Sequence, residues 1–367
     1  AFVPAPRTLS RYIKFPKRLS NNKESYIFLS SLIHENIDKL FPGLQVRGCH
    51  QFRVTMNSNL VFDDEDLNDI KKSLTRLLPE RKYSEAVRLE VAKDCPTDVL
   101  KYLKTQYELT DLDIYKINGP VNLNRFYSIY DDIKLKALKF PEYISKRESR
   151  YVNNKKEYFD YLKDNDIVLH HPYNDFKLVI GFIKAAVLDK KTRAIKQTIY
   201  RTSPNSEIIK LLIKAASRNI SVTVVIELRA KFDEEQNIKI AKMLEDAGVQ
   251  VTYGIRKHKT HAKALLVVRE EKGKLKNYFH LGTGNYNSET ASQYTDFGLI
   301  SSNKEMAYDI HKFFSQLTGS NKDTRFKHLF ISPINSYKKI IKLVSTEIKN
   351  KINGKDAFIR AKMNQLT

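Results

Sequence analysis

Two side chains in the stretch KTHAKALLVV (259–268) are of the types that transfer phosphoryl groups. His261 and Lys263 are two positions apart at the start of an apolar run, and alternate residues of a strand share one face. A neutral imidazole nitrogen can attack phosphorus while a fixed ammonium holds the phosphate oxygens. A single histidine here could also be a core-edge residue bonded to the backbone. The pair predicts a catalytic site in which His261 is the nucleophile and Lys263 binds phosphate.

A second polar segment, HLGTGNYN (280–287), follows the next apolar run. Its small residues expose backbone N–H groups, and the amide of Asn285 can donate to an oxyanion. Turns rich in Gly and Asn are common, so this signal is weak alone. We place Asn285 and His280 in the expected phosphate-binding set, with the alternative that His280 only orients the site or packs. His170 and His171 are expected to shape a strand end.

Regular alternation of strands and helices predicts the elements that position these residues. Strands and helices of such lengths imply an α/β fold with a largely parallel sheet covered on both faces, where ligands collect at the carboxyl ends of strands. Arg201 ends one predicted strand and Lys231 follows the next, each before a helix whose N-terminus favours phosphate. The predicted strands are 166–171, 194–201, 221–228, 249–254, 262–268 and 277–282, and the helices are 175–187, 206–217 and 233–247.

The region before residue 143 reads as a separate α/β head domain without a catalytic cluster. Apolar spacing predicts helices at 23–41, 63–78 and 96–108 and strands at 51–56 and 86–92. A charged, tyrosine-rich connection (131–165) follows, and its tyrosines are expected to pack between domains. We therefore expect a head domain at 1–142 and a first catalytic domain at 143–320.

An internal repeat suggests a third part of the chain. IVLHHPYNDFKLVIGFI (167–183) recurs loosely as HLFISPINSYKKIIKLV (328–344), with Pro172 and Asn174 matching Pro333 and Asn335. AIKQT then corresponds to FIRAKMNQ (358–365). A chance match of short apolar patterns is the alternative. The repeat predicts that 321–367 is the start of a second, truncated catalytic domain.

The charge balance favours a polyanionic partner. The chain has 64 Lys and Arg against 42 Asp and Glu, a net charge of 64 − 42 = +22. Nucleic acid, phosphate chains, nucleotides and anionic lipid all fit, so peripheral membrane contact is compatible with the sequence, and a lysine-rich surface kept for solubility is the alternative. Lys257, His258 and Lys259 are expected to form a solvated basic rim that guides an anionic chain.

The sequence also indicates the cellular compartment of the protein. Cys49 and Cys95 are isolated and share no metal-ligand spacing, which argues against a disulfide framework or a zinc site. No stretch has the length of a transmembrane segment and the opening residues lack the apolar core of a secretory signal. A cytoplasmic protein is expected.

His-x-Lys followed by Gly-Thr-x-Asn resembles the half-site of the phospholipase D superfamily, in which two such patterns meet. That superfamily carries an acid five residues after the lysine, where this chain has Val268, a departure that argues against an ordinary phospholipase or nuclease. With LHHPY (169–173), IKQTIYRTS (195–203), VIELRAKFDEEQNI (225–238) and the long motif HLGTGNYNSETASQYTDFGLI (280–300), the chain resembles bacterial polyphosphate kinases of the long, histidine-phosphorylating type.

This resemblance implies a site and substrates. His261 falls on the family's phosphohistidine, which takes the terminal phosphoryl group of ATP and passes it reversibly to inorganic polyphosphate. Tyr294 falls on an ATP-contacting tyrosine, and Arg201 on an arginine of the magnesium–phosphate site. Lys231 stands where the family has a second arginine. Since a cation cannot ligate Mg²⁺, we expect both to hold phosphates beside the metal.

The resemblance further implies a phospholipase-D-like catalytic domain, Mg²⁺ as cofactor, ATP, ADP and polyphosphate as partners, and a homo-oligomer, a dimer or a tetramer. No specific nucleic acid is expected. Because the family's N-terminal domain and second half-site are not in the sequence, the chain alone is expected to be inactive. Two alternatives stay open: a phospholipase-D-like phosphodiesterase or nuclease, and a basic polyanion-binding module without catalysis.

Overall fold

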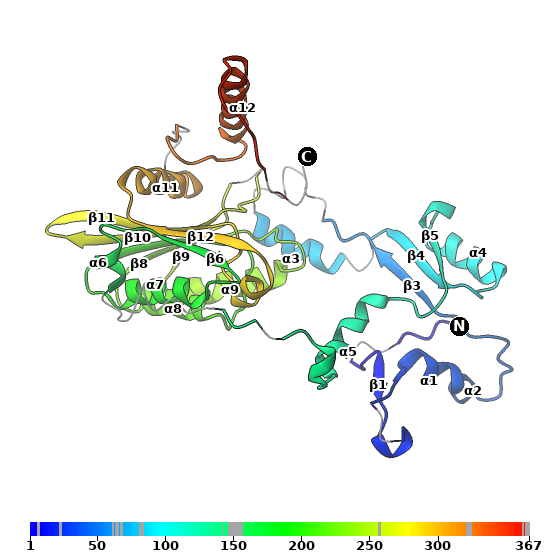
Figure 1. The fold of residues 1–367 in the computed structure, drawn as a ribbon. Coiled ribbons are helices and arrows are strands. Elements are labelled where there is room, and N and C mark those ends of the chain that lie inside the picture. The colour runs from blue at the N-terminus through cyan, green and yellow to red at the C-terminus, as the bar shows by residue number, and fades with distance from the viewer. Residues whose placement is uncertain are drawn as a thin grey trace. The chain divides into compact units, whose positions relative to one another are not determined.

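The protein is described by a computed structural model that covers residues 1–5, 8–21, 24–60, 62, 66, 69–80, 84–141, 143–145, 157–255, 258–320, 325–361 and 363 (Figure 1). The chain divides into two compact units, one of residues 1–61 and 76–142 and one of 62–75 and 143–367. Helix α3 (Ile70–Glu80) contributes to both units. The expected domain limits of 1–142, 143–320 and 321–367 stay a prediction.

The first unit is built on a three-stranded sheet in the order β3-β4-β5. Strand β3 pairs antiparallel with β4, and β5 pairs parallel with β4. Leu89 and Val91 of β4 are fully buried and pack with Leu103 of α4. The elements of this unit are β1 (Tyr12–Lys14), β2 (Tyr26–Phe28), α1 (Leu29–Glu35), α2 (Ile37–Leu40), β3 (Phe52–Met56), β4 (Ala86–Ala92), α4 (Thr97–Gln106), β5 (Ile114–Ile117) and α5 (Tyr127–Asp132).

The single helix predicted at 23–41 is wrong. Within this range, residues 26–28 form β2, which pairs antiparallel with β1. The ring centroids of Tyr12 and Tyr26 are 5.5 Å apart. The Tyr-Ile-Phe sequence favours an extended backbone once a partner strand is present. Asn36 then separates α1 from α2, because its φ and ψ of −122° and 19° leave the helical region.

The second unit is built on a seven-stranded mixed sheet in the order β6-β12-β11-β10-β7-β8-β9 (Figure 1). Its strands are β6 (Ile167–His171), β7 (Thr192–Ile199), β8 (Ser221–Ile226), β9 (Gln250–Thr252), β10 (Lys263–Glu271), β11 (Lys274–Gly282) and β12 (Asp296–Ser301). Its helices are α6 (Glu157–Tyr161), α7 (Lys177–Leu188), α8 (Glu207–Ala216), α9 (Glu234–Asp246), α10 (Ser288–Gln293), α11 (Lys304–Leu317) and α12 (Ser336–Ile352).

The mixed α/β fold class is confirmed, but the expectation that the sheet is mostly parallel is wrong. Within the described residues of this seven-stranded sheet, only the pairings of β7 with β8 and β8 with β9 are parallel. The pairings β10–β11, β10–β7, β11–β12 and β12–β6 are antiparallel. Strands β10 and β11 are joined by Lys272 and Gly273, both at positive φ, and so short a turn can only form a hairpin.

Helices cover both faces of this sheet, as predicted. Helices α7, α8 and α9 lie against one face and α11 against the other (Figure 1). On the α11 side, Phe314 packs with Ala264 and Leu266 of β10. Because side chains alternate along a strand, Lys263 at the start of β10 points to the opposite face. No helix among the described residues combines the length and apolarity needed to cross a membrane.

The turn of the predicted internal repeat is confirmed by matching hydrogen bonds. Asn174 Oδ1 accepts from the His170 amide at 2.7 Å, and Asn335 Oδ1 accepts from the Ile331 amide at 2.7 Å. Each turn leads into a helix, α7 or α12. The second copy differs from the first in that residues 328–332 form no strand, and neither do residues 358–361. The rest of 358–365, apart from Met363, lies outside the described residues.

Candidate phosphoryl-transfer site

The side chains of His261 and Lys263 meet at the start of β10. Lys263 is the first residue of the strand, and its Nζ lies 3.1 Å from His261 Nε2 and 3.2 Å from Nδ1. It also donates to the His261 carbonyl oxygen at 2.7 Å. His261 itself precedes the strand, so the two residues do not share a strand face as expected. They meet because the lysine side chain folds back over the histidine.

The surroundings of the pair favour a neutral imidazole. Partial burial of the ring lowers the pKa of His261, and the charges of Lys263 and Arg201 lower it further. Burial also lowers the pKa of Lys263 to about 8, against the opposing effect of Asp296. At pH 7 the ammonium is therefore mostly protonated, while the imidazole has a free nitrogen lone pair. This is the protonation state that nucleophilic attack on phosphorus requires.

The end of β7 supplies a second cation. The ring of Tyr200 stands edge-on to His261 with centroids 4.6 Å apart. The next residue, Arg201, forms an ion pair with Asp233 at 2.8 Å and donates to the Lys231 carbonyl oxygen at 3.0 Å. The structure thus brings the segment of Arg201 to that of Lys231, and places the charge of Arg201 near enough to His261 to lower its pKa.

The helix N-termini that follow these cations carry polar groups of the chain itself. Ser206 caps α8 by accepting from the Ile208 amide at 3.2 Å. Carboxylates stand in both first turns, Glu207 in α8 and Glu234 in α9, although α9 has no side-chain cap. These negative charges make both helix ends less attractive to phosphate than the side chains of Arg201 and Lys231.

The Gly-rich turn lies beside Lys263. In the register of the sheet, Gly282 at the end of β11 pairs with Lys263. Thr283 Oγ1 donates to Asp296 at 2.8 Å, and Gly284 approaches the same carboxylate so closely that a Cβ would contact it. Asn285 follows in this turn, and its buried Oδ1 has no hydrogen-bond partner among the described residues.

His280 lies in the interior of the sheet. It is 3% exposed, and its Nδ1 is 2.8 Å from the hydroxyl of Tyr286. Burial lowers its pKa to about 3, so the ring stays neutral. This position favours the alternative in which His280 packs or orients its neighbours over direct contact with phosphate.

His170 and His171 shape the end of β6, as predicted. His171 Nδ1 lies 2.8 Å from the Asn174 carbonyl oxygen, and the His170 ring stacks on Phe297 at 4.5 Å. Both rings are therefore held by the protein's own groups.

The remaining predicted residues lie at the surface. Tyr294 follows α10 and is 61% exposed, two residues before Asp296. His258 and Lys259 of the expected basic rim are exposed. Lys257 and its neighbour Arg256 lie outside the described residues.

The described residues do not fit a Mg²⁺ site built from protein ligands. They contain no group of three or more His, Cys, Asp or Glu side chains placed to hold an ion. Arg201 and Lys231 are cations and donate hydrogen bonds, so neither can ligate a metal. Within the part of the chain that the structure describes, Arg201 and Lys231 can thus donate to an anion but cannot form a protein cage for Mg²⁺.

Sequence reasoning missed two carboxylates. Glu227 lies directly after β8, is 1% exposed and accepts from the Thr260 amide. Asp296 begins β12 and opposes the fall in the pKa of Lys263. Both residues lie inside motifs on which the resemblance rests. For Glu227, the available signal was a carboxylate directly after an apolar strand.

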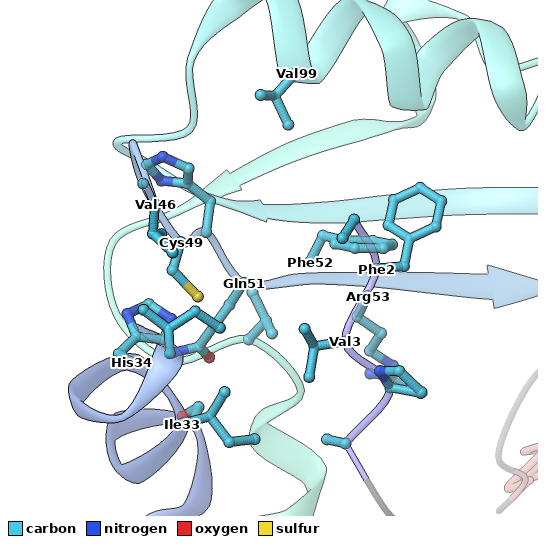
Figure 2. Close-up of a pocket in the computed structure, with 18 of the residues that line it drawn as sticks. Phe2, Val3, Ile33, His34, Val46, Cys49, Gln51, Phe52, Arg53 and Val99 are labelled. Carbon is cyan, nitrogen blue, oxygen red and sulfur yellow. The ribbon is translucent and has the colours of Figure 1, made fainter. Parts of the chain in front are cut away.

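The first unit contains a separate cavity of about 910 Å³. Phe2, Val3, Ile33, Cys49 and Phe52 stand around it (Figure 2). Arg11, Arg53, His34 and His50 add basic groups to its lining. Since none of the predicted site residues lines it, the cavity is distinct from the site at β10.

Comparison with known proteins gives a consistent result. Residues 1–129 match the model of the polyphosphate kinase middle domain, and residues 157–323 match that of polyphosphate kinase C-terminal domain 1. The chain is 43% identical over 366 residues to a polyphosphate kinase of Neisseria gonorrhoeae and 42% identical over 367 residues to one of Pseudomonas aeruginosa. Both matches cover 100% of this chain and 53% of the relative, so the chain spans about half the length of these relatives.

One solved structure supports the fold. The crystal structure of polyphosphate kinase from Porphyromonas gingivalis superposes with a TM-score of 0.73 at 24% identity. The match covers 94% of this chain and 50% of that chain.

Proposed function

The chain belongs to the polyphosphate kinase family, and from this premise we propose that it carries the phosphoryl-accepting histidine of an ATP:polyphosphate phosphotransferase. A ring nitrogen of His261 attacks the terminal phosphorus of ATP, a P–N bond forms, the bond to the bridging oxygen breaks and ADP leaves. The terminal oxygen of a polyphosphate chain then attacks the phosphohistidine, which lengthens the chain by one phosphate and restores the imidazole. Both steps are reversible.

The contact between Lys263 and His261 is the observation that carries this proposal. A neutral imidazole beside a protonated amine, 3.1 Å away, matches the needs of attack on an anionic phosphate. Arg201 and Lys231 would bind the phosphates that approach, and the Asn285 amide would donate to a phosphoryl oxygen. Tyr294 would contact ATP from its exposed position.

Magnesium would arrive with the nucleotide phosphates, where it would neutralise part of their charge. Arg201 and Lys231 would hold the phosphates rather than the ion.

The test uses the full-length protein with Mg²⁺ and ATP labelled in the terminal phosphate. We expect acid-labile, base-stable label on the peptide that contains His261, and none in His261→Ala. His311→Ala is the matched control, because it removes an exposed histidine of α11, the helix on the face of the sheet opposite to Lys263, and should keep labelling within about twofold. Labelling of His261→Ala at the wild-type rate would overturn the proposal.

Two further measurements on the same proteins, phosphodiester cleavage without ATP and polyanion binding, separate the alternatives. Cleavage of a phosphodiester without ATP would support a phospholipase-D-like phosphodiesterase or nuclease. Against it, Val268 packs toward the α11 core at the position where that superfamily has an acid. Polyanion binding unaffected by His261→Ala, with no labelling, would support a non-catalytic binding module.

A further inference from the structure

A buried carboxylate lies behind the segment that carries His261. Glu227 is 1% exposed, and it follows β8, where its own amide donates to the Ile199 carbonyl oxygen at 2.9 Å. Its Oε2 accepts from the Thr260 amide at 2.6 Å. Its Oε1 accepts from the Arg229 amide at 2.9 Å and from Arg229 Nε at 3.1 Å. Three donors of the protein thus bind the carboxylate, two at Oε1 and one at Oε2.

Arg229 extends this contact along the same segment. It is 9% exposed, and its guanidinium donates to the His258 carbonyl oxygen at 2.7 Å. A buried carboxylate is costly without a cation, and Arg229 supplies that cation while reaching the segment itself.

A third hydrogen bond holds the segment from β7. Thr198 Oγ1 donates to the Ala262 carbonyl oxygen at 2.7 Å. The anchors thus fall on residues 258, 260 and 262, one every second residue. Thr260 is buried between them, whereas His261 is exposed. Fixing alternate residues leaves His261 a defined direction toward solvent.

The same cluster also reaches the neighbouring loop of the site. Asn237 of α9 donates to the carbonyl oxygens of Tyr200 and Glu227, both at 2.9 Å. Tyr200 contacts the His261 ring and precedes Arg201. One buried cluster therefore sets both the histidine segment and the segment of the phosphate-binding arginine.

We propose that Glu227, paired with Arg229, is a positioning residue for phosphoryl transfer, which it serves by holding residues 258–262 through the Thr260 amide and the His258 carbonyl. This inference rests on the proposed function, in that the positioned histidine is the phosphoryl acceptor. Glu227 does not touch the reacting atoms. Its effect is on the placement of His261, and displacement of a reacting group by about 1 Å can slow a reaction about a hundredfold.

Two variants of the full-length protein test the proposal. Glu227→Gln leaves one acceptor oxygen where two are used, so either Thr260 or Arg229 loses its acceptor. Glu227→Asp keeps the charge beside Arg229 but is one methylene shorter, so it decides the question if the glutamine variant fails to fold. Asp189→Asn is the matched control, because Asp189 pairs with the largely buried Arg269 at the other end of β10.

Two readouts are compared in each protein, hydrogen exchange of the Thr260 amide and the rate of labelling of His261 by ATP. In the Glu227 variants we expect exchange at least about tenfold faster and labelling about thirtyfold slower or more. Binding of a non-hydrolysable ATP analogue should stay within about threefold. Asp189→Asn should keep wild-type values of both readouts even where its melting temperature falls.

Wild-type exchange or wild-type labelling in both Glu227 variants would overturn the positioning role. A wild-type protein that takes no label at His261 would instead overturn the proposed function. In that case the exchange of Thr260 alone still decides whether Glu227 holds the segment.

Discussion

Burial brings the ionisation of the Lys263 ammonium near to neutral pH. Its pKa is lowered to about 8, so it is protonated below that pH and loses its charge as the pH rises through it. We expect kcat/KM for ATP to fall about tenfold for each unit of pH above 8, because kcat/KM reports ionisations of the free enzyme. Steady-state rates of the full-length protein between pH 6 and 10 measure this limb.

Lys263→Arg provides the control for that limb. A guanidinium stays charged across this range, so the fall above pH 8 should disappear even if the overall rate is lower. An unchanged alkaline limb in Lys263→Arg would show that another group titrates.

Arg201 and Arg193 stand at opposite ends of β7, which makes them a matched pair. Arg201 pairs with Asp233 beside the site, whereas Arg193 pairs with Glu270 at the far end, each at 2.8 Å. Arg201→Met should raise KM for ATP about tenfold or more, since a hydrogen bond to a charged group contributes about 1.5–3 kcal/mol. Arg193→Met should leave KM within about twofold. Equal effects on KM would mean that Arg201 does not bind phosphate.

Among individual residues, the sequence predicts the candidate catalytic pair better than it predicts the buried residue that holds the segment of His261. The proximity of His261 and Lys263 was predicted from a shared strand face, whereas in the structure the lysine side chain folds back over a histidine that precedes the strand. Glu227 was not predicted, because its importance comes from burial and from a partner amide 33 residues away. A contact between residues so far apart in the sequence leaves no local sequence pattern.

The loop between β9 and β10 connects close packing to the site, because Gly254 lies against Thr260, the neighbour of His261. Gly254 has a φ of +71°, and a Cβ on it would collide with Thr260 Oγ1. Gly273, in the β10–β11 turn, has a φ of +73° but nothing within 4 Å of the same position. Alanine at either position meets the backbone strain, and only Gly254→Ala also displaces Thr260.

We therefore expect Gly273→Ala to lower the free energy of unfolding by about 1–2 kcal/mol. Gly254→Ala should lower it by about 1–3 kcal/mol more, since overpacking adds to the strain, and should slow the labelling of His261. Urea denaturation and the labelling assay measure the two effects. Equal stability of the two variants would contradict the close contact.

Element types were predictable where apolar spacing was strong, but strand direction was not. The alternating strands and helices from β6 to β9 follow the predicted ranges within a few residues, because their apolar periods are long. Period and length do not encode pairing partners, so the antiparallel pairings of β10 and β11 were not expected, and β12 was not among the predicted strands. Residues 328–332 repeat the sequence of β6 and its turn without forming a strand, because a strand also needs a neighbour to pair with.

For the whole molecule, the net charge of +22 leaves two interpretations, a surface that attracts polyphosphate or one that only keeps the protein in solution. They differ in how binding responds to salt. Each phosphate contact releases counterions, so the affinity for a long polyanion falls with a power of the salt concentration set by the number of contacts. A surface kept for solubility has no such dependence beyond that of the site itself.

If the charge attracts the substrate, the KM of the full-length protein for long-chain polyphosphate should rise at least about tenfold between 50 and 200 mM salt, as about three contacts would give. KM for ATP should rise less than about threefold, because so short an anion has few condensed counterions to release. Lys259→Gln, on the exposed rim before His261, should reduce the salt slope by about one. Lys190→Gln, exposed in the turn before β7, should leave it unchanged. Equal slopes for polyphosphate and ATP would mean that the excess charge serves solubility, with substrate contact limited to the site at β10.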